Sequence, residues 1–388
     1  MCGHVGIAGN LTHKDEATMK RLFLYDFFRG PDSTGLATVR NSNEVKIAKV
    51  ASHPLDLFDM QKFKDALQAF PSHVFIGHNR LATKGIVNNV NAHPYQFEHI
   101  VGAHNGTLSA ASWKRLEDKL GEKFEVDSKA IFAAIAKFGI EETIPLLRAS
   151  VDNVKCEDAW ALVWFDLNAK TLNFLRNKER PLWTATTADH KRLFWASEWP
   201  MIRAAVELQA APDELWTQEG KGYKFFETEA DVWYSYDIHA LKTATEKYKP
   251  KCKTLKGKEV SQVTYSHTHN AASPFAQAQS ATGKTNLSTT TSLGTVSTVS
   301  AREKDIKHTV VSLYGDDKEP LAGLFDEHEF IKVAGTNCAW CGAEVDFKDH
   351  GLTIFESLRS ALCSDCSGHG NSDQTVRVYA TNLRELMQ

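Results

Sequence analysis

The chain has 388 residues, enough for roughly two to three domains of ordinary size with a sizeable buried core. Hydrophobic residues make up 42%, charged residues make up 24%, and the formal net charge is −3. This is an ordinary globular composition, and its charge gives no reason to expect nucleic acid or an anionic membrane as a partner. The first nine residues are too short and too lightly apolar for a secretory signal, and no stretch approaches the length of a membrane span, so we expect a cytoplasmic protein.

Residues 1–245 alternate between strand-like and helical segments joined by short turns, which predicts one large domain of mixed α and β structure. Helices are predicted at 19–27 and 131–138, where apolar residues recur at steps of three and four. The second helix follows two good N-cap residue types and ends at Gly139. The predicted strands, which are short and rich in β-branched or aromatic residues, are Leu36–Arg40, Val45–Val50, His73–Gly77, His99–Ala103, Ala159–Phe165, Thr171–Arg176 and Leu193–Ala196.

A change of composition separates this region from the C-terminal part of the chain. Between residues 280 and 300, twelve of 21 residues are Ser or Thr and only Lys284 is charged, so this stretch cannot bury enough apolar surface to fold alone. We predict a flexible linker over 246–305. Residues 306–388 regain apolar content and contain four of the seven cysteines, which predicts a small separate module.

Cys2 is the first residue with distinctive chemistry. Because its side chain is small, Met1 should be removable, which would leave a free α-amine beside the thiol. An α-amine titrates near ~8, far below a lysine, and can act as a base at neutral pH. Nucleophile and general base would then belong to one residue, with no need for a catalytic histidine. The alternative for Cys2 alone is a chance cysteine without a role.

Four further segments, read together with the start of the chain, resemble class II glutamine amidotransferases, particularly the glutaminase domain of glucosamine-6-phosphate synthase. The resemblance covers residues 2–245 and follows the order and spacing of the family pattern. It implies an α+β protein with the four-layer αββα fold of N-terminal-nucleophile hydrolases, followed here by the linker and the C-terminal module. The segments are Phe28–Gly35, Gly77–Gly85, Asn91–Pro94 running into Ala103–Thr107, and Val126–Ser128.

The resemblance also implies which residues hold the substrate, L-glutamine. Arg80 would clamp the α-carboxylate, a role that suits the planar fork of a guanidinium. Asp127 would accept the α-ammonium. Thr83 and His93 lie in matching segments and would shape the pocket without being catalytic.

In the implied reaction, Cys2 attacks the glutamine carboxamide and forms a γ-glutamyl thioester, which water then hydrolyses. Asn105 and the backbone N–H of Gly106 would form the oxyanion hole that stabilises the developing negative charge. No cofactor is required for this hydrolysis. Because no known synthase domain is recognisable in the chain, the ammonia would pass to an acceptor on a synthase-like partner protein or in the C-terminal region.

Each site residue has a structural alternative when it is taken alone. Arg80 could be a surface ion-pair partner, the dipeptide Asn105–Gly106 is typical of turns, and Asp127 could be only a helix N-cap. Two rival functions also stay open: an N-terminal-nucleophile acylase that acts on another amide, and a catalytically inactive scaffold with a zinc interaction module.

Three positions depart from the family pattern. Leu81 stands where the best-known relatives have an aromatic residue, Lys84 where they often have histidine, and Lys129 where they have an acidic residue. These departures bear on rate, glutamine affinity and coupling to an acceptor. They leave the nucleophile, the carboxylate clamp and the oxyanion donors in place.

Near the C-terminus, two CxxC pairs separated by 21 residues predict a structural tetrathiolate zinc site. A small module with little core would gain much of its folding free energy from such a metal. An iron-sulfur centre and unligated thiols are the alternatives. From residue 331 to residue 388 there are five Lys plus Arg and seven Asp plus Glu, the wrong sign of charge for a nucleic-acid surface, so we expect protein contact or stabilisation. The predicted ligands are Cys338, Cys341, Cys363 and Cys366, with His350 and His369 as substitutes.

Overall fold

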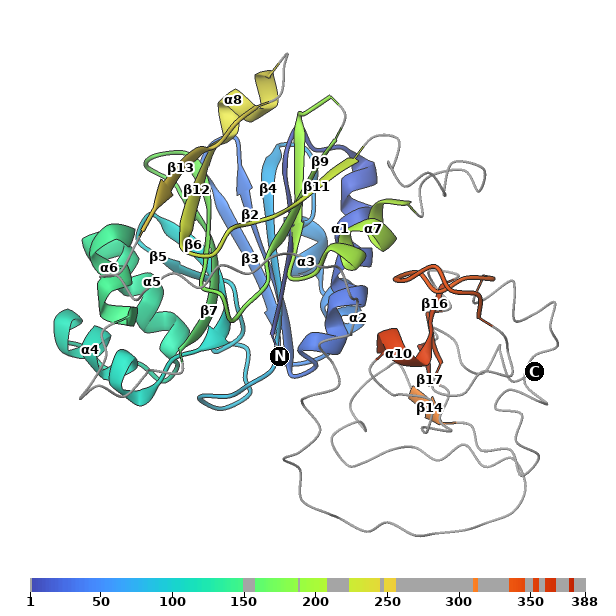
Figure 1. The fold of residues 1–388 in the computed structure, drawn as a ribbon, viewed down its shortest axis with the longest axis horizontal. Coiled ribbons are helices and arrows are strands. Elements are labelled where there is room, and N and C mark those ends of the chain that lie inside the picture. The colour runs from blue at the N-terminus through green and yellow to red at the C-terminus, as the bar shows by residue number, and fades with distance from the viewer. Residues whose placement is uncertain are drawn as a thin grey trace, which may run out of the picture. The chain divides into compact units, whose positions relative to one another are not determined.

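The structure is a computed structural model, and it divides into two compact units, Met1–Glu259 and Val260–Gln388 (Figure 1). Within the part that the structure describes, no helix is both long and apolar enough to cross a membrane. The described residues are 2–148, 158–187, 189–207, 223–244, 248–255, 310–312, 335–345, 352–355, 360–367 and 377–379.

Unit 1, the first of these units, contains two antiparallel sheets. In order across it, the seven-stranded sheet consists of β11 (Tyr223–Glu227), β9 (Trp183–Thr187), β10 (Arg192–Ala196), β1 (Gly3–Gly9), β4 (Ser72–Arg80), β2 (Ser33–Arg40) and β3 (Val45–Val50). The six-stranded sheet consists of β13 (Lys251–Thr254), β12 (Val232–Asp237), β8 (Thr171–Arg176), β7 (Ala159–Asp166), β6 (Ile100–Thr107) and β5 (Tyr95–Phe97).

The two sheets pack face to face, and helices cover their outer faces (Figure 1). Fully buried side chains such as Val74 and Ile76 from one sheet and Val101 and Val163 from the other form the core between the sheets. This is the αββα layer order that the resemblance implies. The seven-stranded sheet is covered by α1 (His13–Asp26), the 3-10 turn η1 (Phe27–Arg29), α2 (Pro54–Asp59), α3 (Gln61–Ala66) and α7 (Trp199–Glu207). The six-stranded sheet is covered by α4 (Ala110–Leu120), α5 (Asp127–Phe138) and α6 (Ile140–Arg148), and the short α8 (Ile238–Thr243) follows β12.

The predicted elements of residues 1–245 are confirmed, with some changes at their ends. β3 and β8 have the predicted bounds, whereas β4 and β6 run to Arg80 and Thr107 and so contain residues of the predicted site. The helix predicted at 19–27 begins earlier, at His13, where the side chains and backbone of Thr12 and Asp15 form a capping box.

β1 is a strand that the sequence pattern does not predict, because three of its seven residues are glycine. It is nevertheless a central strand, between β10 and β4. A Cβ atom at Gly6 would lie 2.0 Å from the indole ring of Trp195 and 2.4 Å from the carbonyl oxygen of Phe75. Glycine is therefore required where the neighbouring strand and ring approach the backbone most closely.

The boundary predicted at residue 245 is wrong by one strand. β13 lies inside the predicted linker and pairs with β12, with Cys252 opposite Tyr234. Its four residues are all exposed and two of them are lysines, which protects a sheet edge but also makes the segment resemble a linker in composition. Residues 246, 247 and 256–305 of the predicted linker lie outside the described residues.

Unit 2, the second unit, contains a small four-stranded sheet. In order across it, the strands are β14 (Val310–Ser312), β17 (Arg377–Tyr379), β15 (Thr353–Phe355) and β16 (Ser360–Leu362), and α10 (Ser364–Ser367) follows β16. The buried apolar side chains in its described part are few: Trp340, Val345, Leu352, Ile354, Ala361 and Leu362.

Candidate active site and metal centre

The Cys2 thiol lies directly before β1, and the residue is only 7% exposed. Its sulfur is 3.3 Å from the backbone nitrogen of Leu81, which donates to it, and 3.3 Å from the Leu81 carbonyl oxygen, to which the thiol donates. Burial raises the pKa of Cys2 above its ordinary value of 9.0, against the smaller lowering effects of the Leu81 hydrogen bond and the Arg80 charge. The thiol is therefore protonated at neutral pH and needs a base before it can attack.

Arg29 and Asp32 brace the surroundings of this thiol. Arg29 Nε donates to the Cys2 carbonyl oxygen at 3.1 Å, and the same guanidinium forms an ion pair with Glu198. The Asp32 carboxylate accepts a hydrogen bond of 2.7 Å from the backbone of Ala82, in the loop after β4. The first contact fixes the backbone of Cys2, and the second fixes the loop after β4, whose backbone contacts the Cys2 sulfur.

Arg80, at the end of β4, is buried, with 4% exposure. Its guanidinium donates to the carbonyl oxygens of Lys84 and Ile86, the latter at 3.4 Å. In the described part of the chain it forms no ion pair, so the alternative of a surface ion pair is wrong. A buried cation without a carboxylate partner is a candidate receptor for an anionic group.

Asp127 is the first residue of α5, and its carboxylate accepts bonds of 2.8 Å from the backbone nitrogens of Leu108 and Ser128. The N-cap residue is Val126, so the alternative in which Asp127 is only a helix N-cap is wrong. The charges of both Asp127 and Arg80 act on the pKa of Cys2, in opposite directions. The nucleophile candidate therefore lies within electrostatic reach of both predicted substrate handles.

Asn105 and Gly106 lie inside β6, opposite Ala161 and Trp160 of β7, so the turn alternative is wrong. The Asn105 side-chain Nδ2 donates to Ser197 Oγ at 3.2 Å. A Cβ atom at Gly106 would lie 1.8 Å from the carbonyl oxygen of Ala159, and the Gly106 φ of 156° also disfavours a side chain.

Thr83 and His93 differ in their surroundings. Thr83 Oγ1 lies 2.9 Å from Thr107 Oγ1, so it links the loop after β4 to the end of β6. His93 is buried, and its Nδ1 lies 3.1 Å from Nδ1 of His78. Burial lowers the pKa of His93 well below 6.5, as it does for His78.

Two residues near Cys2 were missed in the sequence analysis. The Asp26 carboxylate is fully buried against Gly3, and in the described structure both of its oxygens lack a hydrogen-bond partner. Burial raises the pKa of Asp26 to about 8. His4 is fully buried between the sheets, and its Nε2 lies 3.0 Å from the Asn105 nitrogen. The sequence signal that could have pointed to Asp26 is a carboxylate at an otherwise apolar helix end. No comparable sequence signal points to His4.

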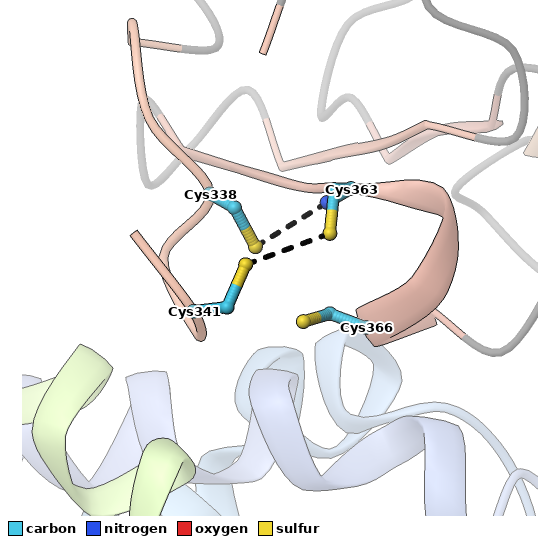
Figure 2. A group of neighbouring side chains, drawn as sticks. All are labelled: Cys338, Cys341, Cys363 and Cys366. Atoms are coloured by element: carbon cyan, nitrogen blue, oxygen red, sulfur yellow. Dashed lines mark hydrogen bonds between the residues drawn. The ribbon is translucent and has the colours of Figure 1, made fainter. Parts of the chain in front are cut away.

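In unit 2, the sulfur atoms of the four cysteines all lie within 4.8 Å of one another, and Figure 2 shows them converging from two segments. Cys341 Sγ and Cys363 Sγ are 3.7 Å apart, close to the ~3.8 Å between ligands of a tetrahedral zinc with bonds of ~2.3 Å. The backbone nitrogen of Cys363 donates to Cys338 Sγ at 3.4 Å. The donor set therefore fits a metal ion. His350 and His369 lie outside the described residues.

No protein-family model matches the chain. Among curated proteins, it is similar to the isomerizing glutamine–fructose-6-phosphate aminotransferase of Sulfurisphaera tokodaii, with 29% identity over 194 residues, which are 47% of this chain and 31% of that protein. The enzyme of the same name from Methanococcus maripaludis is 32% identical over 146 residues, which are 37% of this chain and 23% of that protein. The chain thus spans less than a third of the length of these curated relatives.

These relatives are class II glutamine amidotransferases, enzymes with an N-terminal cysteine nucleophile, and the present chain has Cys2. The chain is similar to members of this family over less than half of its length. Among solved structures, the chain is similar to a glutamine phosphoribosylpyrophosphate amidotransferase from B. subtilis complexed with ADP and GMP. That comparison has a TM-score of 0.47 and 17% identity, and it covers 66% of this chain and 49% of the other.

Proposed function

We propose that this chain is a class II glutamine amidotransferase that hydrolyses L-glutamine with Cys2 as the nucleophile, after Met1 has been removed. The observation that carries the proposal is the position of the Cys2 thiol, which is buried before β1 and lies within reach of the charges of both Arg80 and Asp127. A cation and an anion whose charges both act on the nucleophile suit a substrate that carries both an α-carboxylate and an α-ammonium.

In the proposed first step, the thiol proton moves to the freed α-amine of Cys2 while the sulfur bonds to the carboxamide carbon of glutamine. The negative charge on the carboxamide oxygen is stabilised by Asn105 Nδ2 and the Gly106 N–H. An amide NH2 has two donors, so Asn105 can serve the oxyanion and keep its bond to Ser197. The α-ammonium then returns its proton to the leaving nitrogen, the C–N bond breaks, and ammonia departs.

Water completes the cycle by attacking the γ-glutamyl thioester, with the α-amine again as base, and glutamate is released. Arg80 holds the α-carboxylate throughout. Its bonds to the carbonyl oxygens of Lys84 and Ile86 use part of the five donors of the guanidinium, which leaves the others for the substrate. Asp127 holds the α-ammonium, while Thr83 and His93 shape the pocket.

A glutaminase assay with matched cysteine variants tests this proposal. We expect the wild type to release glutamate from glutamine and Cys2→Ala to release none above background. The control variant Cys252→Ala, which changes the exposed cysteine of β13, should retain wild-type activity. Activity in Cys2→Ala equal to wild type would rule out the assigned nucleophile. Hydrolysis of other amides but not of glutamine would favour an acylase instead.

We further propose that the ammonia passes to an acceptor bound by a synthase-like partner protein. The support is the name of the relatives, glutamine–fructose-6-phosphate aminotransferase, which pairs glutamine with an acceptor. Native purification followed by mass spectrometry tests the idea. Recovery of a synthase-like protein that stimulates glutaminase turnover would support it, and a chain that always purifies alone would count heavily against it.

For unit 2, we propose that residues 306–388 form a separate module whose four cysteines bind a structural zinc ion. The spacing of the sulfurs supports a closed tetrahedral site without a position for water. Elemental analysis should find one zinc per chain in the wild type and in Cys252→Ser, and less in Cys366→Ser. Iron and sulfide in place of zinc, or no metal, would overturn the assignment.

A further inference from the structure

His4 belongs to the strand that follows the nucleophile, and its ring contacts the other sheet. β1 is a strand of the seven-stranded sheet, but His4 Nε2 lies 3.0 Å from the backbone nitrogen of Asn105 in β6 and 2.9 Å from the carbonyl oxygen of Ala161 in β7. Asn105 and Ala161 are register partners. A single imidazole therefore joins the strand after the nucleophile to the residue pair that contains the proposed oxyanion donor.

Either neutral tautomer of the His4 ring can hold Asn105 and Ala161 through Nε2. A bare Nε2 accepts the Asn105 N–H, and a protonated Nε2 donates to the Ala161 oxygen. The other ring nitrogen, Nδ1, is buried and has no hydrogen-bond partner in the described structure, so Nε2 makes the polar contacts of the ring. Because burial lowers the pKa of His4 to about 3, the ring stays neutral over the working range of most enzymes.

The backbone of His4 also contacts the side chain that orients the Asn105 amide. The His4 N–H donates to Ser197 Oγ at 2.8 Å, and the Ser197 N–H donates to the His4 carbonyl oxygen at 2.9 Å. The same Ser197 Oγ accepts from Asn105 Nδ2 at 3.2 Å. Asn105 is thus held at its backbone by the His4 ring and at its side chain by Ser197, and all three residues are almost fully buried.

We propose that His4 and Ser197 are positioning residues for the oxyanion hole, and that they fix the distance between the Cys2 sulfur and the Asn105 amide. This inference rests on the proposed glutaminase function. Only one residue separates Cys2 from His4. The contact of the His4 ring with Asn105 therefore couples the position of the Cys2 sulfur, just before β1, to that of Asn105 in β6. A donor acts on the transition state only if it is already aligned where the charge develops, so a loose Asn105 would lower kcat more than it raises KM.

The test compares His4→Leu, which keeps an apolar side chain of moderate size, with His4→Gln, whose amide reaches a similar position and can accept or donate. We expect His4→Leu to lower kcat by about 10- to 100-fold, less than the ~10²–10³-fold typical for complete loss of an oxyanion donor, with KM nearly unchanged. His4→Gln should recover most of the lost rate. His239→Leu, which changes an exposed histidine of α8, should match the wild type.

Alkylation of Cys2 by iodoacetamide separates positioning from general disruption, because this reaction needs no oxyanion hole. The alkylation rate should be the same in the wild type, His4→Leu and His4→Gln. If His4→Leu fails to fold, Ser197→Ala provides the second test, with the same expected fall in kcat at unchanged KM. An active wild type with unchanged kcat in the variants, or a loss of alkylation that parallels the loss of turnover, overturns the positioning role alone. A wild type without glutaminase activity overturns the proposed function and this inference with it.

Discussion

The two units assemble their candidate sites in different ways. In unit 1, the site depends on residues that are far apart in the sequence, as with His4 and Asn105, which are 101 positions apart and meet between the packed sheets. In unit 2, each of two short CxxC segments contributes two sulfurs, and the residues that the structure describes there include few buried apolar side chains. We infer that packing maintains the first site without an ion, whereas an ion is needed to maintain the second.

Metal removal should give the largest difference between the two units. Structural zinc sites contribute apparent binding free energies of about 10–16 kcal/mol at neutral pH, so a chelator should unfold unit 2 and leave unit 1 intact. Hydrogen exchange measured by mass spectrometry should show loss of protection at 335–345 and 360–367 but not at 72–80. Protection that survives complete removal of the metal would show that unit 2 holds its fold by packing.

Loss of the proposed oxyanion donor, Asn105 of unit 1, should give the next largest effect. We expect Asn105→Ala to lower kcat by about 10²–10³-fold, with little change in KM, because the amide acts on the transition state. The matched control is Asn168→Ala, which changes an exposed residue of the turn between β7 and β8. Steady-state kinetics with glutamine measure kcat and KM of both variants. Equal losses of kcat in Asn105→Ala and Asn168→Ala would contradict the proposed role of Asn105.

The boundary between the units can be tested by truncation. A chain that ends at Glu259 retains β13, whereas a chain that ends at Pro250 loses its pairing with β12 and the hydrogen bond from Arg148 to the Leu255 carbonyl oxygen. Each lost hydrogen bond costs about 0.5–1.5 kcal/mol, and the ladder together with the Arg148 bond comprises several such bonds, so we expect the shorter chain to be less stable by at least about 2 kcal/mol. Urea denaturation of the two chains measures this difference, and equal midpoints would place β13 outside the domain.

The smallest effect for one residue and one pH unit is the pH dependence that each buried histidine contributes to the stability of unit 1. Burial lowers the pKa of His4, His78, His93 and His104 in the folded state, so below about pH 6.5 the unfolded chain binds more protons than the native one. Stability should be complete above that pH and fall by about 1.4 kcal/mol per pH unit for each such histidine as the pH decreases toward the folded pKa values. Denaturant unfolding at a series of pH values measures the slope. His4→Gln, which removes one of the four buried histidines, should reduce the slope.

The sequence predicted these two regions unequally well. Strands such as β3 and β8 follow from their β-branched and aromatic residues, and the four cysteines of unit 2 follow from their spacing alone. β1 could not be predicted, because its glycines are explained only by the approach of Trp195 from a strand far along the chain.

The same reason explains the residues of the site that were missed. Arg80, Asn105 and Asp127 each look like ordinary structural residues in isolation, and only their order along the chain linked them. The environments of His4 and Asp26 are created by the packing of the sheets and helices, so no local pattern reveals them. Proximity between distant segments is the information that a single sequence contains least directly.

The most direct test of the central claim is the intact mass of the purified chain before and after treatment with an electrophilic glutamine analogue. We predict a chain that lacks Met1 and gains one equivalent of the analogue, with the label on Cys2, and we predict that excess glutamine slows the labelling. A chain that retains Met1, or a free Cys2 that reacts no faster with the analogue than the exposed Cys252 does, would contradict the account.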